Sequence, residues 1–260
     1  MISRLRRACM GVLLSALFLG GPAFAHSGAA PGQAPAKTVV LVHGYFADGS
    51  SWSRVIPLLQ AAGINVVAVQ NPLASLDGDV EVTRRVIDQQ AGQVVLVGHS
   101  FGGMVITQAG IDPKVASLVY VCGYAPSPGD SINTLQAGLS SPPWLADLVH
   151  DDSGDFTLTQ AGILKYFAPD VPPKTGKEIA AVQGAFFIGT LGQSVSDAAW
   201  LTKPSSFIQC DDDQIIDPAL ELRMAAKINA KLVSVRSSHV VMISHPEIVA
   251  QTIIDAVLKP

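Results

Sequence analysis

Hydrophobic positions along the chain fall into short continuous runs that alternate with stretches of helical spacing. The continuous runs are rich in β-branched residues and lie at 37–43, 64–70, 93–98, 115–122, 206–210 and 231–235. Helical spacing falls at residues 51–63, 79–90, 100–110, 218–228 and 245–258. Continuous β-branched runs are typical of strands that are buried on both faces of a sheet. The alternation therefore predicts an α/β fold, with a mostly parallel sheet of about six strands and helices on both faces.

Residues 126–203 break this alternation. The segment is rich in proline and carries no strand signal, yet it is too long for a bare loop in a compact domain. We interpret it as a small, mainly helical insertion over one end of the sheet, and we call residues 126–203 the lid.

The N-terminal residues have the pattern of a secretory signal. Several arginines precede an apolar run at 11–20, and the small-x-small sequence AFA follows at 23–25. The apolar run is too short to span a bilayer as a helix. We therefore expect residues 1–25 to be a cleaved signal peptide, 26–36 a flexible linker and 37–260 the folded domain. The mature protein is expected to be periplasmic or secreted, without a membrane contact.

Composition excludes two further classes of protein. Apolar residues make up 48% of the chain and charged residues 15%, which excludes a disordered chain. The formal charge of −4 argues against a nucleic-acid partner, which would favour a basic surface.

Two cysteines remain beyond the expected leader, Cys122 and Cys210, and both end predicted strands. Two buried thiols are the default interpretation. An exported protein can also hold a disulfide. A bridge requires that the two strands are neighbours and that the Cα atoms lie within about 7 Å.

The sequence GHSFG at residues 98–102 fits Gly-x-Ser-x-Gly and lies between a buried strand and a helix. A sharp strand-to-helix turn of this kind lifts the hydroxyl of Ser100 clear of the sheet. Bulky side chains at the flanking glycine positions would collide with the neighbouring backbone. The amide of Phe101 and the start of the helix face any negative charge that develops beside the serine. The alternative is an ordinary glycine-rich turn with a structural serine.

A nucleophilic serine needs a base, and the base needs an acid, which follow the serine in the order acid, then histidine. Of the six histidines, His239 follows the last predicted strand after a short polar run. It is favoured over His245, which precedes a proline and reads as a helix start. His43 and His99 are interpreted as structural residues at strand ends. Spacing does not choose among four candidate acids, which are Asp211, Asp212, Asp213 and Asp217.

Four segments together resemble the α/β-hydrolase superfamily: VHG at 42–44, GHSFGG at 98–103, FIQCDDD at 207–213 and SHVVM at 238–242. The chain is most similar to the branch that holds plant methylesterases, plant hydroxynitrile lyases and small bacterial esterases, over residues 37–258. The resemblance implies that the acid is Asp213. It also implies an oxyanion hole made by the backbone amides of Tyr45 and Phe101, which the small residue Gly44 supports.

The expected activity is hydrolysis of small to medium carboxylic esters by Ser100, His239 and Asp213 through an acyl-enzyme, without metal or cofactor. Hydroxynitrile lyases of this branch carry a lysine after the catalytic histidine, where this chain has Val240, and a threonine in place of Gly44. The lyase interpretation is therefore disfavoured. A haloperoxidase-like perhydrolase activity stays open because it uses the same triad. A peptidase stays open too, although no feature favours it. A non-catalytic binding protein would be marked by a broken triad, and every position of this one is filled.

Candidate substrate contacts come mainly from large apolar residues of the lid. The expected pocket residues are Tyr45, Trp144, Phe167, Phe187 and Met242. The alternative is that most of these side chains only pack the lid onto the sheet. The acidic segment 151–155 lacks the glutamate of a calcium loop and is interpreted as a solvated turn. The expected partner is a small ester, and the expected state is a monomer or homodimer.

Overall fold

The computed structural model describes residues 38–258 of the chain. The expected signal peptide and linker lie outside these described residues. Within this range, none of the helices combines the length and the apolar character that a membrane crossing requires.

A six-stranded sheet in the order β2-β1-β3-β4-β8-β9 carries the structure, and all neighbouring pairs are parallel. Its strands are β1 (Thr38–Val42), β2 (Asn65–Ala68), β3 (Val94–His99), β4 (Val115–Val121), β8 (Ser205–Cys210) and β9 (Lys231–Val235). The central strands β1 and β3 are buried along their whole length, which explains their unbroken apolar runs. The predicted parallel sheet is confirmed.

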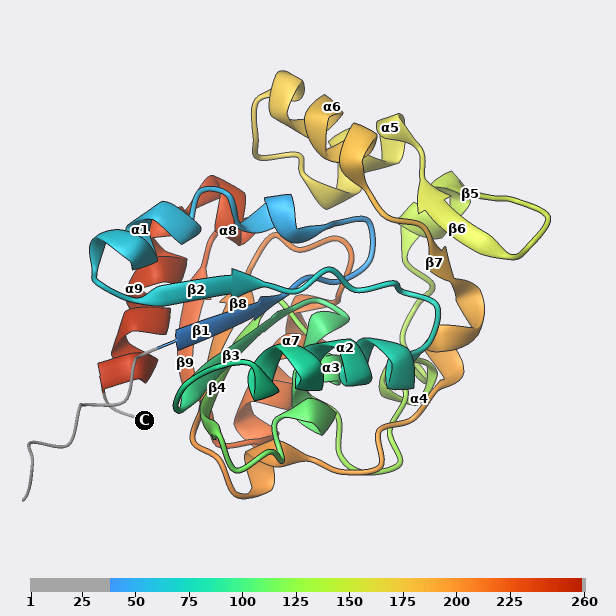
Figure 1. Cartoon of the computed structure of the whole chain (residues 1–260). Helices are drawn as coiled ribbons and strands as arrows, with labels where there is room; N and C mark the ends of the chain where they lie inside the picture. Colours follow the sequence, from blue (N-terminus) through green and yellow to red (C-terminus); the bar gives the residue numbers. More distant parts are fainter. Residues whose placement is uncertain (1–37, 259–260) are drawn as a thin grey trace, which may run out of the picture. The chain divides into compact units, whose positions relative to one another are not determined.

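Helices cover both faces of this sheet. Figure 1 shows α1 and α9 on one side and α2 and α3 on the other. The helices outside the lid are α1 (Ile56–Ala61), α2 (Leu76–Asp88), α3 (Gly102–Ala109), α7 (Pro218–Lys227), α8 (Val241–Ser244) and α9 (Pro246–Leu258). Every residue of α3 is buried. This helix follows the turn of Ser100 directly and packs between the sheet and α2.

The lid lies between β4 and β8. It contains α4 (Ile132–Leu135), α5 (Gln160–Gly162) and α6 (Pro173–Val182), and also a three-stranded antiparallel sheet. The strands of that sheet are β5 (Leu148–His150), β6 (Asp155–Leu158) and β7 (Phe186–Phe187). The expectation of a mainly helical lid is therefore incomplete. Strands this short leave too few positions for an alternating pattern to be recognised.

Short helical turns complete the backbone. They are the 3-10 segments Gly49–Trp52, Pro143–Asp147, Ile188–Gly192 and Ala199–Leu201, and the π-helical segment Ile163–Phe167. Residues 151–154 of the acidic segment form the turn between β5 and β6, where the Asp151 carboxylate accepts hydrogen bonds from the amides of Ser153 and Asp155.

Cys122 and Cys210 form a disulfide, with their Cα atoms 5.5 Å apart. The default interpretation of two free buried thiols is corrected. The sheet order makes β4 and β8 neighbours. The Cys122 amide donates to the carbonyl oxygen of Ile208 at 2.8 Å, and this pairing brings Cys122 close to Cys210. The bridge thus joins the carboxyl ends of β4 and β8, at the edge of the sheet where the chain leaves for the lid.

Candidate active site

Ser100 lies at the tip of the turn between β3 and α3, with its backbone in the left-handed region at a φ of 54°. Glycines on either side make this turn feasible. A Cβ on Gly98 would lie 2.5 Å from the Gly102 carbonyl oxygen, and a Cβ on Gly102 would lie 2.4 Å from that of Val42. The strained turn and its glycines thus have the geometry that the Gly-x-Ser-x-Gly pattern predicts.

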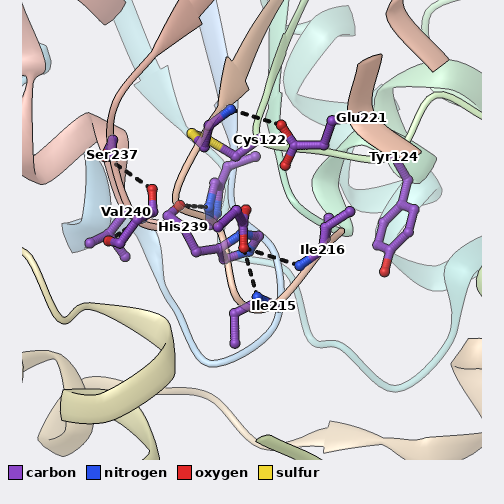
Figure 2. A network of polar contacts seen from close by, with 12 residues as sticks. Cys122, Tyr124, Ile215, Ile216, Glu221, Ser237, His239 and Val240 are labelled. Atoms are coloured by element: carbon purple, nitrogen blue, oxygen red, sulfur yellow. Dashed lines mark hydrogen bonds and ion pairs between the residues drawn. A yellow bond between two sulfur atoms is a disulfide. The ribbon is translucent and has the colours of Figure 1, made fainter. Parts of the chain in front are cut away.

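The loop after β9 brings His239 against Asp213. The imidazole Nδ1 lies 2.5 Å from Asp213 Oδ2, and both side chains are fully buried. The other carboxylate oxygen accepts from the amides of Ile215 at 2.7 Å and Ile216 at 3.0 Å. Figure 2 labels Ile215, Ile216 and His239, the three residues that donate to this carboxylate. Three donors hold the acid in place, and Nδ1 of the imidazole is the protonated nitrogen.

The remaining imidazole nitrogen, Nε2 of His239, is buried and has no hydrogen-bond partner among residues 38–258. A buried polar atom without a partner costs free energy, so it commonly marks a place where a ligand or a reacting group binds. With Nδ1–H donated to Asp213, this nitrogen is a proton acceptor. A general base needs such an acceptor nitrogen.

The other candidates from the sequence do not reach this pair. The remaining acids are all exposed: Asp211, Asp212 and Asp217. Asp212 pairs with Arg236 at 3.3 Å, and Asp217 caps α7 through the amide of Ala219 at 2.7 Å. His245 ends the short helix α8 and contacts the hydroxyl of its neighbour.

His99 joins the turn of Ser100 to the loop that carries His239. Its Nε2 donates to the His239 carbonyl oxygen at 2.9 Å, and the two ring centroids are 4.6 Å apart. Burial lowers the pKa of His99 well below its usual value, and the neighbouring His239 lowers it further. The side chain is therefore neutral. The sequence predicts a structural role for His99 at a strand end. Its contact with the loop of His239 becomes visible only in the folded structure.

The loop after β1 lies against the same turn. A Cβ on Gly44 would be 2.7 Å from the Cβ of Ser100 and 2.9 Å from the amide nitrogen of Phe101. Only glycine allows this approach without a shift of the backbone. Among the described residues, the amides of Tyr45 and Phe101 have no acceptor. These two amides are the ones expected to form an oxyanion hole, and both remain available to a ligand.

Glu221, on α7, was not singled out from the sequence. Its side chain is fully buried, and its Oε2 accepts from the Cys210 amide at 2.9 Å (Figure 2). Burial raises the pKa of Glu221 well above its usual value, and the negative Asp213 raises it further. Burial and the neighbouring carboxylate therefore both favour the protonated form of Glu221. No sequence signal separates it from the exposed glutamates that such helices normally carry.

A cavity of about 140 Å³ opens beside Ser100. Its other lining residues are Tyr45, Phe46, Tyr124, Ile132, Asn133, Gln136, Trp144, Leu145, Leu191 and Ile215. Most of these side chains are apolar, and many come from the lid. Among residues 38–258, no group of three or more histidine, cysteine or acidic side chains is arranged to hold a metal ion.

The structure places Tyr45 and Trp144 in this lining, whereas the other three expected pocket residues lie outside it. Phe167 packs on the His239 ring, with centroids 5.3 Å apart. Phe187 lies on β7 with 39% of its surface exposed, and Met242 is buried within α8. None of these three side chains lines the cavity. The direction in which a side chain points depends on tertiary packing, which amino-acid composition does not specify.

The aromatic side chains of the pocket also fasten the lid to the sheet. Tyr45 is stacked between Phe101 at 4.3 Å and Phe186 of the lid at 4.1 Å, and its hydroxyl contacts Thr190 of the lid at 2.6 Å. Trp144 lines the cavity and donates to a carbonyl oxygen at 3.2 Å. The two interpretations of these residues, pocket and packing, therefore apply together.

Comparison with known proteins adds an independent observation. Residues 39–252 match the family model described as the alpha/beta hydrolase family. The alpha/beta hydrolase nvfD of Aspergillus novofumigatus is 26% identical, over 84% of this chain and 95% of that protein. Methylesterase 1 of Arabidopsis thaliana is 25% identical, over 68% of this chain and 78% of that protein. The crystal structure of polyneuridine aldehyde esterase is similar with a TM-score of 0.74 at 19% identity, over 84% of this chain and 98% of that one.

Proposed function

Because this chain belongs to the alpha/beta hydrolase family, we propose that it cleaves small to medium carboxylic esters with Ser100, His239 and Asp213 as its catalytic triad. Esterases are among its relatives, including methylesterase 1. One observation carries the proposal. The imidazole of His239 is fixed by a buried carboxylate and its other nitrogen lacks a partner among the described residues, in a loop that His99 joins to the strained turn of Ser100.

The proposed reaction begins when the Ser100 hydroxyl attacks the ester carbonyl carbon and His239 Nε2 takes its proton. Asp213 holds the other ring nitrogen and stabilises the imidazolium that forms. The amides of Tyr45 and Phe101 donate to the developing oxyanion, and each such donor is worth about 3–4 kcal/mol of barrier.

The tetrahedral intermediate then collapses. The ester C–O bond breaks, and the leaving alcohol takes the proton from His239, which leaves an acyl group on Ser100. A water molecule then gives its proton to His239 and attacks the acyl carbon. Collapse of this second intermediate returns the proton to Ser100 and releases the carboxylic acid.

The apolar cavity beside Ser100 supports a substrate with an apolar part of modest size. Val240 is buried beside the base, so no cation is available at the position that follows His239. This supports ester hydrolysis over cyanide release.

The test is Ser100→Ala, assayed on p-nitrophenyl acetate and butyrate, together with labelling by a serine-reactive fluorophosphonate. We expect loss of the fluorophosphonate label and a fall in kcat of about 10⁶-fold, as is usual when a triad nucleophile is removed. Ser194→Ala, at an exposed serine of the lid, is the matched control and should retain both. Undiminished turnover in Ser100→Ala would overturn the proposal.

We also propose that the protein is exported and loses residues 1–25. The disulfide between Cys122 and Cys210 supports an oxidising compartment. Intact mass spectrometry of protein recovered from the periplasm or medium should give a chain that starts at His26. A chain that retains its first residues in the cytosol would argue against export.

A further inference from the structure

We propose that Asp170, a residue of the lid, is a positioning residue that holds the loop of His239 in its reactive place. The inference rests on the proposed function, because it assigns a role to Asp170 through the proposed base. Asp170 lies between the π-helical segment Ile163–Phe167 and helix α6 (Pro173–Val182), far in sequence from the loop that it contacts.

Three donors from the two residues before His239 converge on this one carboxylate. Asp170 Oδ2 accepts from the Ser238 amide at 2.8 Å and lies 3.0 Å from the Ser237 hydroxyl, which is also 2.8 Å from the Ser244 hydroxyl. Asp170 Oδ1 accepts from the Ser238 hydroxyl at 2.5 Å. Both serines are buried, so their polar groups have little access to water as an alternative partner.

The carboxylate is charged when it makes these bonds. Burial would raise the pKa of Asp170, but the hydrogen bonds from Ser238 and Ser237 lower it below its usual value. Hydrogen bonds to an ionised acceptor are stronger than neutral ones. The hydrogen bonds from Ser237 and Ser238 to Asp170 are therefore stronger than the same bonds to a neutral acceptor would be.

The same lid segment also holds the imidazole itself. Phe167, three residues before Asp170, packs on the ring of His239 at 5.3 Å and on that of His99 at 6.4 Å. The ring is thus supported by Phe167 from the lid and by Asp213 from the loop after β8, while Asp170 holds the backbone just before it. Asp170 is not among the residues that line the cavity beside Ser100, so its effect is expected to pass through the loop of His239.

Loss of Asp170 should leave the lid attached. The stack of Tyr45 on Phe186 at 4.1 Å and the hydrogen bond from Trp144 to Ile215 at 3.2 Å hold the lid over the cavity without it. Substrate affinity should therefore change little, while the rate of the chemical steps should fall. This separation distinguishes a positioning role from a role in fastening the lid.

The experiment compares Asp170→Ala and Asp170→Asn with the wild type, measuring kcat and KM on p-nitrophenyl acetate and the rate of fluorophosphonate labelling. For Asp170→Ala we expect kcat and the labelling rate to fall by about 10- to 100-fold, the range that a displacement near 1 Å produces. KM should stay within about twofold. Asp170→Asn keeps one acceptor oxygen and should recover part of the loss. Asp152→Ala, which removes an exposed lid carboxylate of the β5–β6 turn, is the matched control and should change nothing.

Two results would overturn the proposal: an unchanged kcat in Asp170→Ala, or a raised KM at unchanged kcat, which is the signature of a fastening role. Should Asp170→Ala not fold, as judged by circular dichroism, Asp170→Asn and Ser238→Ala decide the question, and both must lower kcat. If wild-type Ser100 is labelled while Asp170 variants react normally, this inference alone fails. If wild-type Ser100 is not labelled at all, the proposed function fails.

Discussion

The close approach of Gly44 to the serine turn makes Gly44→Ala the sharpest test of the oxyanion hole. The added methyl group would meet three atoms of the turn at once. It would lie 2.7 Å from the Cβ of Ser100 and 2.9 Å from both the Phe101 nitrogen and the His99 oxygen. Ordinary contacts between such atoms begin near 3.5 Å, so the two backbones must separate by about 0.6–0.8 Å.

A separation of this size acts on both amide donors, because Gly44 precedes Tyr45 and its new Cβ pushes on Phe101. Loss of one oxyanion donor costs about 3–4 kcal/mol, which corresponds to a fall of about 10²- to 10³-fold in kcat. Overpacking should also lower the free energy of unfolding by about 1–3 kcal/mol. The activity loss should therefore be much larger than the loss of stability explains.

The assay is kcat and KM on p-nitrophenyl butyrate for Gly44→Ala, with thermal unfolding measured in parallel. Gly184→Ala is the matched control, because a Cβ there lies no closer than 3.4 Å to Leu73 and 3.5 Å to Ala47. It should keep wild-type activity. A Gly44→Ala protein that melts normally and retains kcat within about twofold would refute the assignment of this loop to the oxyanion hole.

Two further predictions concern stability. Replacing both Cys122 and Cys210 by alanine opens a loop of 88 residues, which should lower the free energy of unfolding by about 4–5 kcal/mol in non-reducing urea titrations; an unchanged value would contradict the bridge. Burial raises the pKa of Asp79 to about 7, so the folded protein keeps a proton that the unfolded chain loses near pH 4. Stability from this group is present below about pH 4 and is lost as the pH rises through about 7. Asp79→Asn should flatten the pH dependence of urea unfolding in that window, and a slope equal to that of the wild type would contradict the assignment.

The central sheet could be predicted because its strands are buried on both faces. An unbroken β-branched run such as that of β3 indicates a buried strand and fits few other structures. The glycines around Ser100 mark the turn that follows it. The resemblance to the methylesterase branch is confirmed by the relatives, which include methylesterase 1. The acid that pairs with His239 was harder to predict from spacing, because four aspartates follow β8 and their residue type does not distinguish them. Asp213 differs from them by the amides of Ile215 and Ile216, which only the folded loop provides.

The remaining features depend on contacts between segments far apart in the chain. Glu221 reads as a surface residue of a helix until α7 is placed against β8, where the side chain becomes buried. Asp170 reads as a turn residue until the lid meets the loop of His239. Phe187 and Met242 were expected in the pocket because they are large and apolar, yet size and polarity do not specify where a side chain points.

The disulfide between Cys122 and Cys210 has a consequence for how the lid of this protein can be exchanged. Cys122 and Cys210 join the carboxyl ends of β4 and β8, so the strand that the chain leaves for the lid is tied covalently to the strand to which it returns. A lid of different length or sequence would then be inserted between two strands whose relative position is already fixed. If Asp170 has the proposed positioning role, an exchanged lid would also have to supply a carboxylate to the serines before His239.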